Sequence, residues 1–266
     1  NPNHVGKTYH NVASIDFTSS YPYVMLSEKF PMSKPEKVNP TKEQFLKWVN
    51  DDNVGLMFVV RFKGLQSKLS FETYLSESKC DVLEKPIINN GRVFKADTVQ
   101  TTITDIDFKI LYKCYTWDSI EIANVHKFYM QYLPKPILLA IVELYEKKTT
   151  LKDVSGKEVE YLVNKGMLNS VYGMCVTDIV RDNISYKDDW QYEKYTIEMM
   201  NEQIEKYNSS SNRFLYYPWG VWVTAYARKN LWNGILEIGI DYVYSDTDSI
   251  KFLNYEKHTE YINRYN

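Results

Sequence analysis

Two aspartates near the end of the chain, Asp246 and Asp248, have a residue type and spacing that could support metal chemistry. They lie in the segment 245–249, between two short apolar stretches at 242–244 and 250–252 that we expect to form a β-hairpin. If a strand continued through both aspartates, their carboxylates would face one side of the sheet. Carboxylate oxygens are ligands that Mg²⁺ prefers. Asp-Thr-Asp is also an ordinary turn sequence, so the rest of the chain must decide between the two interpretations.

A third aspartate ends a predicted strand near the start of the chain. Residues 12–17 have the pattern of a buried strand, which stops at Thr18-Ser19-Ser20. The Tyr21-Pro22 pair then favours an extended or turn conformation before a short helix. Asp16 is therefore expected at the end of a strand.

The middle of the chain alternates strand and helix patterns. We expect strands at 55–62, at 91–102 and at 119–128, with the second entered through an Asn-Asn-Gly turn. Thr104 and Asp105 are expected to cap a helix that runs to about Tyr115. This block is therefore predicted to be α+β.

The second half of the chain is predicted to be more helical. Apolar residues recur at helical spacing from Pro136 to Tyr145, the segment 153–156 breaks the pattern, and a second helix starts near Glu158. Two neighbouring helices with a short polar turn predict an antiparallel helical hairpin. A further helix is expected at 221–238.

Composition limits the function classes. With 266 residues, 44% of them hydrophobic, the chain can form a folded core. The longest strongly apolar run, 137–142, is far shorter than the roughly 20 residues of a membrane-spanning helix. The three cysteines lie far apart and suggest neither a disulfide framework nor a zinc site, which favours a reducing, cytoplasmic location. The 32 basic and 34 acidic residues give no electrostatic signature of nucleic-acid binding, so motifs must carry that inference.

Three motifs occur in the order expected for one enzyme family. YSDTDS at 244–249 resembles motif C of the B-family DNA polymerases, and DFTSSYP at 16–22 resembles motif A. KGMLNSVYG at 165–173 resembles motif B, with its lysine, Asn-Ser and Tyr-Gly at the spacing of the family. The resemblance spans nearly the whole chain and is hard to produce by chance.

Within that family, the chain looks most similar to the protein-primed polymerases of bacteriophages and linear plasmids. The features are Lys148-Thr149-Thr150, the stretch 174–178 and YPWGVWVTAYAR at 217–228. The resemblance implies an α+β polymerase palm with an antiparallel sheet backed by helices, a two-helix fingers element and an α+β insertion. The implied division is palm at 1–29, insertion at 30–133, fingers at 134–175, second insertion or connector at 176–216, and palm at 217–266.

The implied activity is that of a DNA-directed DNA polymerase, a nucleotidyltransferase that adds dNTPs to a 3′-hydroxyl with two metal ions. Two Mg²⁺ ions are implied, for which Mn²⁺ can substitute. The resemblance makes Asp16 and Asp248 the bridging ligands, assisted by the carbonyl of Phe17. It places Asp246 beside them as a third catalytic carboxylate.

The same resemblance assigns nucleotide and DNA contacts. Tyr21 matches the steric gate that excludes a 2′-hydroxyl, and Lys148 and Lys165 match lysines that bind the triphosphate. Asn169 and Tyr172 match residues that pack against the nascent base pair. Implied contacts to DNA are Ser19, Ser170, Gly173, Thr224 and Arg228.

The expected partners are primer-template DNA, dNTPs and a terminal protein that serves as primer. We expect a monomer in the cytoplasm, without membrane association, that replicates a viral or plasmid genome. An exonuclease domain before motif A, a thumb after motif C and a lysine motif that follows motif C are missing from the sequence. A fragment of a longer protein, with poor activity in isolation, is therefore expected.

Two alternatives remain. A reverse transcriptase-like polymerase would share the palm, but such enzymes place the two motif C aspartates side by side, whereas Thr247 separates them here. The other alternative is a non-catalytic palm that binds DNA or a terminal protein. Since every expected carboxylate is present, the sequence itself shows no degeneration.

Overall fold

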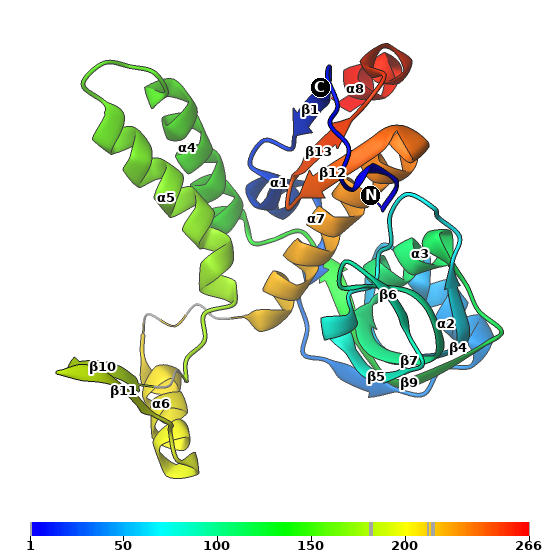
Figure 1. The fold of residues 1–266 in the computed structure, drawn as a ribbon. Coiled ribbons are helices and arrows are strands. Elements are labelled where there is room, and N and C mark those ends of the chain that lie inside the picture. Colours follow the sequence, from blue (N-terminus) through cyan, green and yellow to red (C-terminus); the bar gives the residue numbers. More distant parts are fainter. Residues whose placement is uncertain (1, 181–182, 212, 214–215, 266) are drawn as a thin grey trace. The chain divides into compact units, whose positions relative to one another are not determined.

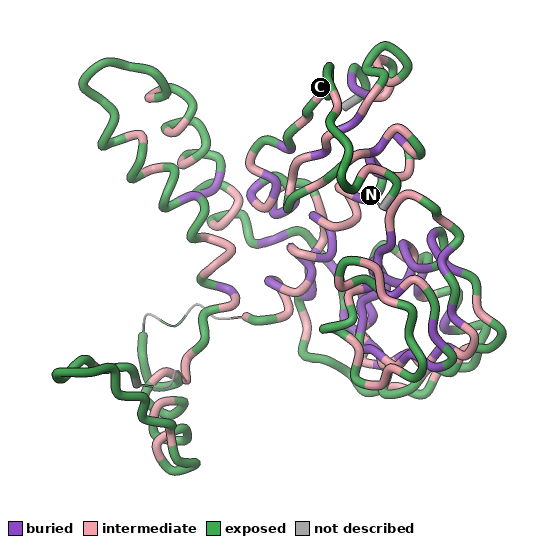
Figure 2. Tube along the Cα trace, in the orientation of Figure 1, coloured by how far each residue is buried: buried purple, intermediate pink, exposed green. Residues whose placement is uncertain are grey.

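A computed structural model describes residues 2–180, 183–211, 213 and 216–265. The chain divides into two compact units, one formed by residues 1–142 and 221–266 and the other by residues 143–220. The boundaries fall within two helices, α4 (Lys135–Leu151) and α7 (Tyr217–Ile238). Buried residues are concentrated in the first unit, whereas most of the second is exposed (Figure 2).

The smaller sheet of the first unit joins the two ends of the chain. Its central strand is β13 (Ser249–Phe252), flanked by β1 (Ala13–Asp16) and β12 (Tyr242–Asp246), and both pairings are antiparallel (Figure 1). This confirms the predicted hairpin and the predicted N-terminal strand. The same region also contains the helices α1 (Ser20–Ser27) and α8 (Thr259–Tyr265).

Close packing fixes α7 against this sheet. A Cβ atom on Gly234 would lie 2.5 Å from Cδ1 of Ile250 in β13 and 2.5 Å from the hydroxyl oxygen of Tyr261 in α8. Only a residue without a side chain allows the helix this approach, which explains a glycine in a helix interior.

The larger sheet of the first unit is antiparallel, has eight strands and curls around an apolar core (Figure 1). Its main path is β2-β9-β4-β7-β5, with β3, β6 and β8 paired at its margins. The bounds are β2 (Phe30–Pro31), β3 (Glu36–Val38), β4 (Val54–Ser67), β5 (Cys80–Glu84), β6 (Ile87–Asn89), β7 (Arg92–Thr104), β8 (Tyr115–Thr116) and β9 (Ser119–Gln131). The three strands predicted in this region are confirmed as β4, β7 and β9, each extending beyond its predicted end.

Two helices accompany this sheet, α2 (Lys42–Val49) and α3 (Asp105–Cys114), and both begin with a capping box. In α3 the Thr104 hydroxyl accepts a hydrogen bond from the backbone N–H of Asp107, while the Asp107 carboxylate accepts one from the N–H of Thr104. Three aromatic rings, Phe45, Phe58 and Phe108, meet edge to face in the core beneath. Thr104 is confirmed as the predicted cap of α3, whereas the carboxylate of Asp105, also predicted as a cap, accepts from the backbone N–H of Leu56 at 3.0 Å instead.

The second unit contains α5 (Glu158–Cys175), α6 (Ile197–Ser209), the C-terminal part of α4, and a hairpin of β10 (Asn183–Lys187) and β11 (Asp189–Glu193). The break between α4 and α5 falls at residues 152–157, which confirms the predicted helical hairpin. The β10–β11 hairpin and α6 were not predicted. Single-turn 3₁₀ helices occur at Pro2–His4, Glu77–Lys79, Gly239–Asp241 and Tyr255–His258.

The structure thus combines α and β elements with antiparallel sheets, as the sequence predicts at this coarse level. No helix in the part of the chain that the structure describes has both the length and the apolarity needed to cross a bilayer.

Candidate functional site

The three-stranded sheet places Asp16 and Asp246 in one row. Asp16 is paired with Ser249 on one side of β13, and Asp246 is paired with the same Ser249 on the other side. Directly paired residues in a sheet point to the same face. Both aspartates are exposed, so two carboxylates from distant parts of the chain share the open face of one small sheet.

Asp248 lies in the turn between β12 and β13, next to both of these residues. Its backbone N–H donates to the carbonyl of Asp246 at 2.6 Å, and its own carbonyl accepts from the N–H of Phe17 at 2.8 Å. Thr247, the other turn residue, has a left-handed φ of 50°. The strand ends at Asp246, so the turn, and not strand periodicity, positions the Asp248 side chain.

The electrostatics also indicate that the carboxylates are close. Partial burial, followed by the negative charges of Asp16 and Asp246, raises the pKa of Asp248 above its usual value. Mutual repulsion of this kind is relieved by a cation. Asp248 is half-buried, whereas Asp16 and Asp246 are exposed.

The donor set fits a metal that is shared with a substrate. In the described residues, no group of three or more His, Cys, Asp or Glu side chains is arranged to hold a metal ion. Mg²⁺ at phosphoryl-transfer sites usually takes one or two carboxylates, with water and substrate phosphates completing its shell. Asp16 and Asp248 match that smaller requirement. Phe17 is only 3% exposed, and this burial anchors the backbone beside Asp16 in the core.

The predicted gate residue lies in the first turn of α1. Ser19, which precedes this helix, has a left-handed φ of 51°, and its carbonyl accepts from the N–H of Tyr23 at 2.9 Å. Tyr21 follows two residues later and is half-buried, and Pro22 beside it is buried. The chain therefore turns at Ser19, between the end of β1 at Asp16 and the start of α1, and Tyr21 lies in the first turn of that helix.

The second unit brings the two predicted phosphate-binding lysines together. Burial and then the charges of Lys165 and Lys152 lower the pKa of Lys148, so these ammonium groups are close enough to repel. The ammonium of Lys148 lies 5.3 Å from the ring centre of Tyr145, and that of Lys165 lies 5.9 Å from the ring centre of Tyr161. An anion between the lysines would relieve their repulsion.

The other residues of α5 that are predicted to contact the base pair or DNA lie close together in its C-terminal half. Asn169 and Ser170 are exposed, and Tyr172 and Gly173 are half-buried. The Ser170 hydroxyl donates to the carbonyl of Gly166 at 2.8 Å, a bond within the helix. A Cβ on Gly173 would meet no atom within 4 Å, so the surface there is open.

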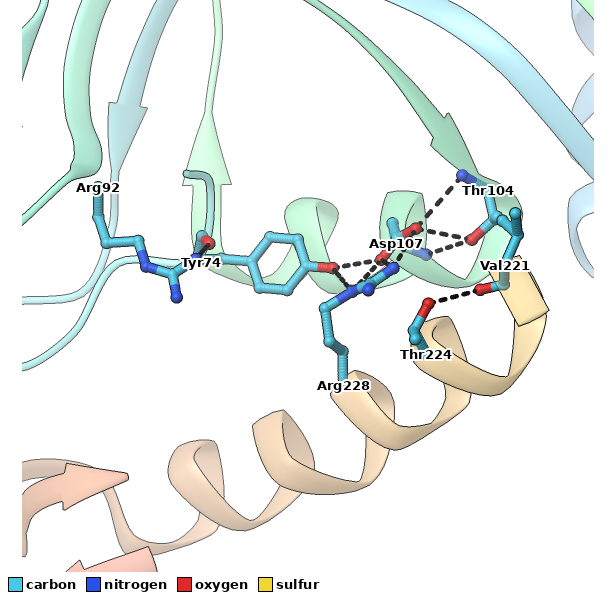
Figure 3. A network of polar contacts seen from close by, with 7 residues as sticks. All are labelled: Tyr74, Arg92, Thr104, Asp107, Val221, Thr224 and Arg228. Atoms are coloured by element: carbon cyan, nitrogen blue, oxygen red, sulfur yellow. Dashed lines mark hydrogen bonds and ion pairs between the residues drawn. The ribbon is translucent and has the colours of Figure 1, made fainter. Parts of the chain in front are cut away.

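Arg228, predicted to contact DNA, takes part in a polar network inside the first unit (Figure 3). Its Nε donates to Oδ1 of Asp107 at 2.9 Å, and its Nη2 donates to Oδ2 at 3.1 Å. Nε also lies 3.3 Å from the Tyr74 hydroxyl, which itself donates to Asp107. The Asp107 side chain is 8% exposed and that of Arg228 is 42% exposed. The network therefore ties α7 to the N-terminus of α3.

Thr224, also predicted to contact DNA, lies one turn earlier on α7 (Figure 3). Its hydroxyl donates to the carbonyl of Val221 at 2.9 Å, so it has a local partner. Sequence reasoning missed the partners of Arg228, because Asp107 is a normal capping residue in sequence and nothing local links it to α7.

No protein family and no curated protein matches the chain at the sequence level. Among solved structures, phi29 DNA polymerase complexed with primer-template DNA matches with a TM-score of 0.66 and 18% identity, over 91% of this chain and 38% of that chain. The fold resembles part of a DNA polymerase.

Two further structures of the same polymerase agree. Its orthorhombic crystal form matches with a TM-score of 0.64 and 18% identity, over 91% of this chain and 38% of that one. Its ternary complex with primer-template DNA and incoming nucleotide substrates matches with a TM-score of 0.64 and 16% identity, over 91% and 39%. The present chain thus spans about two fifths of the length of these polymerases.

Proposed function

We propose that this chain is the palm and fingers core of a B-family DNA-directed DNA polymerase of the protein-primed type. The observation that carries the proposal is the pairing of β1 and β12 on either side of β13, which brings Asp16 and Asp246 into one row beside Asp248. The likeness of the fold to phi29 DNA polymerase supports it. In this proposal the palm comprises residues 1–29 and 217–266, and the fingers comprise residues 134–175.

The metal-binding role falls to the carboxylates. Asp16 and Asp248 would hold two Mg²⁺ ions together with the carbonyl of Phe17, and Asp246 would adjust the charge of the site from beside them. Bound Mg²⁺ supplies Lewis-acid stabilisation of the charge on the attacking oxygen and on the leaving pyrophosphate. The chain itself contributes a fixed row of carboxylates on a rigid sheet.

The nucleotide-binding role falls to side chains on α1, α4 and α5. Lys148 and Lys165 would offset the charge of the triphosphate, and their closeness supports this role, since after burial the charge of Lys165 contributes to the lowered pKa of Lys148. Tyr21 would exclude a 2′-hydroxyl by contact with the sugar. Asn169 and Tyr172 would pack against the nascent base pair.

The remaining assignments concern larger partners. Ser19, Ser170, Gly173 and Thr224 would contact primer-template DNA, and the insertions at 30–133 and 176–216 would contact DNA or the terminal protein that provides the priming hydroxyl. Arg228 would stabilise α7 through its hydrogen bonds to Asp107. Only the N–H groups of its guanidinium that do not bind Asp107 would be able to contact a DNA phosphate.

Electron paramagnetic resonance of Mn²⁺ in the presence of a dNTP tests the proposal. We expect the wild-type chain to bind the metal-nucleotide and Asp248→Asn to weaken this binding at least tenfold, because one carboxylate ligand is lost. Asp97→Asn is the control, since Asp97 is an exposed carboxylate that pairs with Lys85 at 3.1 Å in the larger sheet. The control should bind as the wild type does.

Two results would contradict the proposal. A folded wild type that binds no better than Asp248→Asn would favour the alternative of a non-catalytic palm that binds DNA or protein. Equal incorporation opposite RNA and DNA templates by the full-length enzyme would instead favour a reverse transcriptase-like polymerase.

A further inference from the structure

The hairpin that carries Asp246 and Asp248 has a buried face opposite its carboxylates. Ile15 and Ser245 are both paired with Ile250, so these three residues share the row next to that of Asp16, Ser249 and Asp246 and face the opposite side of the sheet. The register shift between Tyr242 and Tyr244 inserts one residue in β12. This bulge turns Tyr242 to the same buried face as Ser245.

Tyr242 is 1% exposed, and its hydroxyl joins the hairpin to a distant carboxylate. It donates to Oε2 of Glu72 at 3.0 Å and lies 2.9 Å from the Ser245 hydroxyl oxygen. A phenol has a single hydrogen to donate, so the Ser245 hydroxyl must donate to Tyr242. Burial raises the pKa of Tyr242, which keeps the phenol neutral and able to donate.

Glu72 is itself held in place. Its Oε1 accepts from the N–H of Thr73 at 2.8 Å, and the residues that follow, Thr73, Tyr74 and Leu75, are each at most 6% exposed. The N–H of Leu75 donates to the hydroxyl of Tyr115 at 3.1 Å. The loop between β4 and β5, in which residues 73–75 are buried and hydrogen-bonded, therefore presents the Glu72 carboxylate to the back of the hairpin.

The same loop also reaches α7. Tyr74 donates to Asp107 and contacts Arg228, and its carbonyl accepts from Nη1 of Arg92 at 3.0 Å (Figure 3). Two residues of one short loop, Glu72 and Tyr74, thus support the two palm segments that frame the carboxylates. The Tyr74 contact stabilises the helix, and the Glu72 contact acts on the hairpin itself.

We propose that Glu72 is a positioning residue that acts through Tyr242 and Ser245 to hold the β12–β13 hairpin, and with it Asp246 and Asp248, in the geometry that binds metal and nucleotide. This inference rests on the proposed function. Ser245 directly precedes Asp246, so fixing its hydroxyl on the buried face fixes the Asp246 carboxylate on the open face.

Hydrogen exchange of the metal-free chain, measured by mass spectrometry on peptides that cover residues 242–252, tests the structural half. We expect Glu72→Ala to speed exchange there about fivefold, because a hydrogen bond to a charged acceptor is lost. Tyr242→Phe, which keeps the ring and removes the hydroxyl, should do the same. Glu72→Gln retains an oxygen acceptor for the phenol and should stay within about twofold of wild type.

The control is Asp97→Ala, which removes an exposed carboxylate from the same region of the chain without touching the hairpin. It should leave exchange at 242–252 unchanged. If a folded Glu72→Ala exchanges in this segment at the wild-type rate, the inference is overturned.

Binding of Mn²⁺ with a dNTP tests the positioning half, at a temperature where every variant is folded. We expect Glu72→Ala to lower the affinity about fivefold and Glu72→Gln to restore it. Unchanged affinity in Glu72→Ala, with a wild type that binds, overturns the positioning role even if the hairpin exchanges faster. A wild type that does not bind refutes the proposed function instead, and exchange alone then decides whether Glu72 orders the hairpin.

Discussion

Arg228→Ala should destabilise the protein through Asp107, because it removes the guanidinium from a carboxylate that is only 8% exposed. Removing one partner of a fully buried ion pair typically destabilises by about 3–5 kcal/mol. Here Arg228 is 42% exposed, and Thr104 and Tyr74 still donate to the Asp107 carboxylate. Solvent screening and the remaining bonds reduce the expected loss to about 2 kcal/mol.

Urea unfolding followed by circular dichroism measures this loss, and a thermal midpoint about 4–8 °C below wild type should accompany it. Arg264→Ala is the matched control, since Arg264 pairs with Glu237 at 2.8 Å with side chains 61% and 49% exposed. It should lose less than about 0.5 kcal/mol. A double-mutant cycle with Asp107→Asn should give a coupling energy of about 1–2 kcal/mol.

Equal losses for Arg228→Ala and Arg264→Ala would refute the reasoning. If Arg228→Ala also weakened primer-template binding and reduced its dependence on salt, a phosphate contact would be the main role of this arginine.

Three further predictions concern single residues. Gly234→Ala should destabilise by about 1–3 kcal/mol in urea unfolding, because its Cβ would lie 2.5 Å from Ile250, whereas Gly166→Ala, with no atom within 4 Å, should not destabilise. Burial raises the pKa of Asp105 to about 7, so the folded state holds a proton that the unfolded state releases. Stability should therefore fall by up to about 4 kcal/mol as pH rises from about 4 to about 7, and Asp105→Asn should remove that slope in urea titrations. Tyr21→Val should raise the affinity for Mn²⁺ with an rNTP, relative to a dNTP, about tenfold in paramagnetic resonance titrations, and an unchanged ratio would exclude a gate role.

The sequence predicts much of the fold because its strongest elements have local signals. The strand before Asp16 has apolar residues and a turn signal, and the start of α3 is marked by Thr104, which is its N-cap. The β10–β11 hairpin was missed because its turn residue with positive φ is Asp188, without the glycine that usually marks such a turn.

The candidate site was only partly predictable. The resemblance to the family motifs singled out Asp16 and Asp248, but the sequence left open whether a strand continues through Asp248, and the structure shows that β12 ends at Asp246. Nothing in the sequence around Glu72 indicates that it contacts the hairpin. Its role depends on a bulge in β12 and on a contact to Tyr242, and neither can be seen in a linear pattern.

The central position of β13 has a consequence for how the protein forms. β1 is made first, yet its sheet partner is β13, near the other end of the chain, whereas β4, β7 and β9 find their partners within the region between β1 and α4. Contacts between segments so far apart in the sequence form slowly, and during synthesis β1 leaves the ribosome long before β13 does. The larger sheet can therefore be complete before β12 and β13 bring Asp246 and Asp248 next to Asp16. If the proposed function holds, metal affinity should therefore be the last property that the folding chain acquires, after most of its secondary structure.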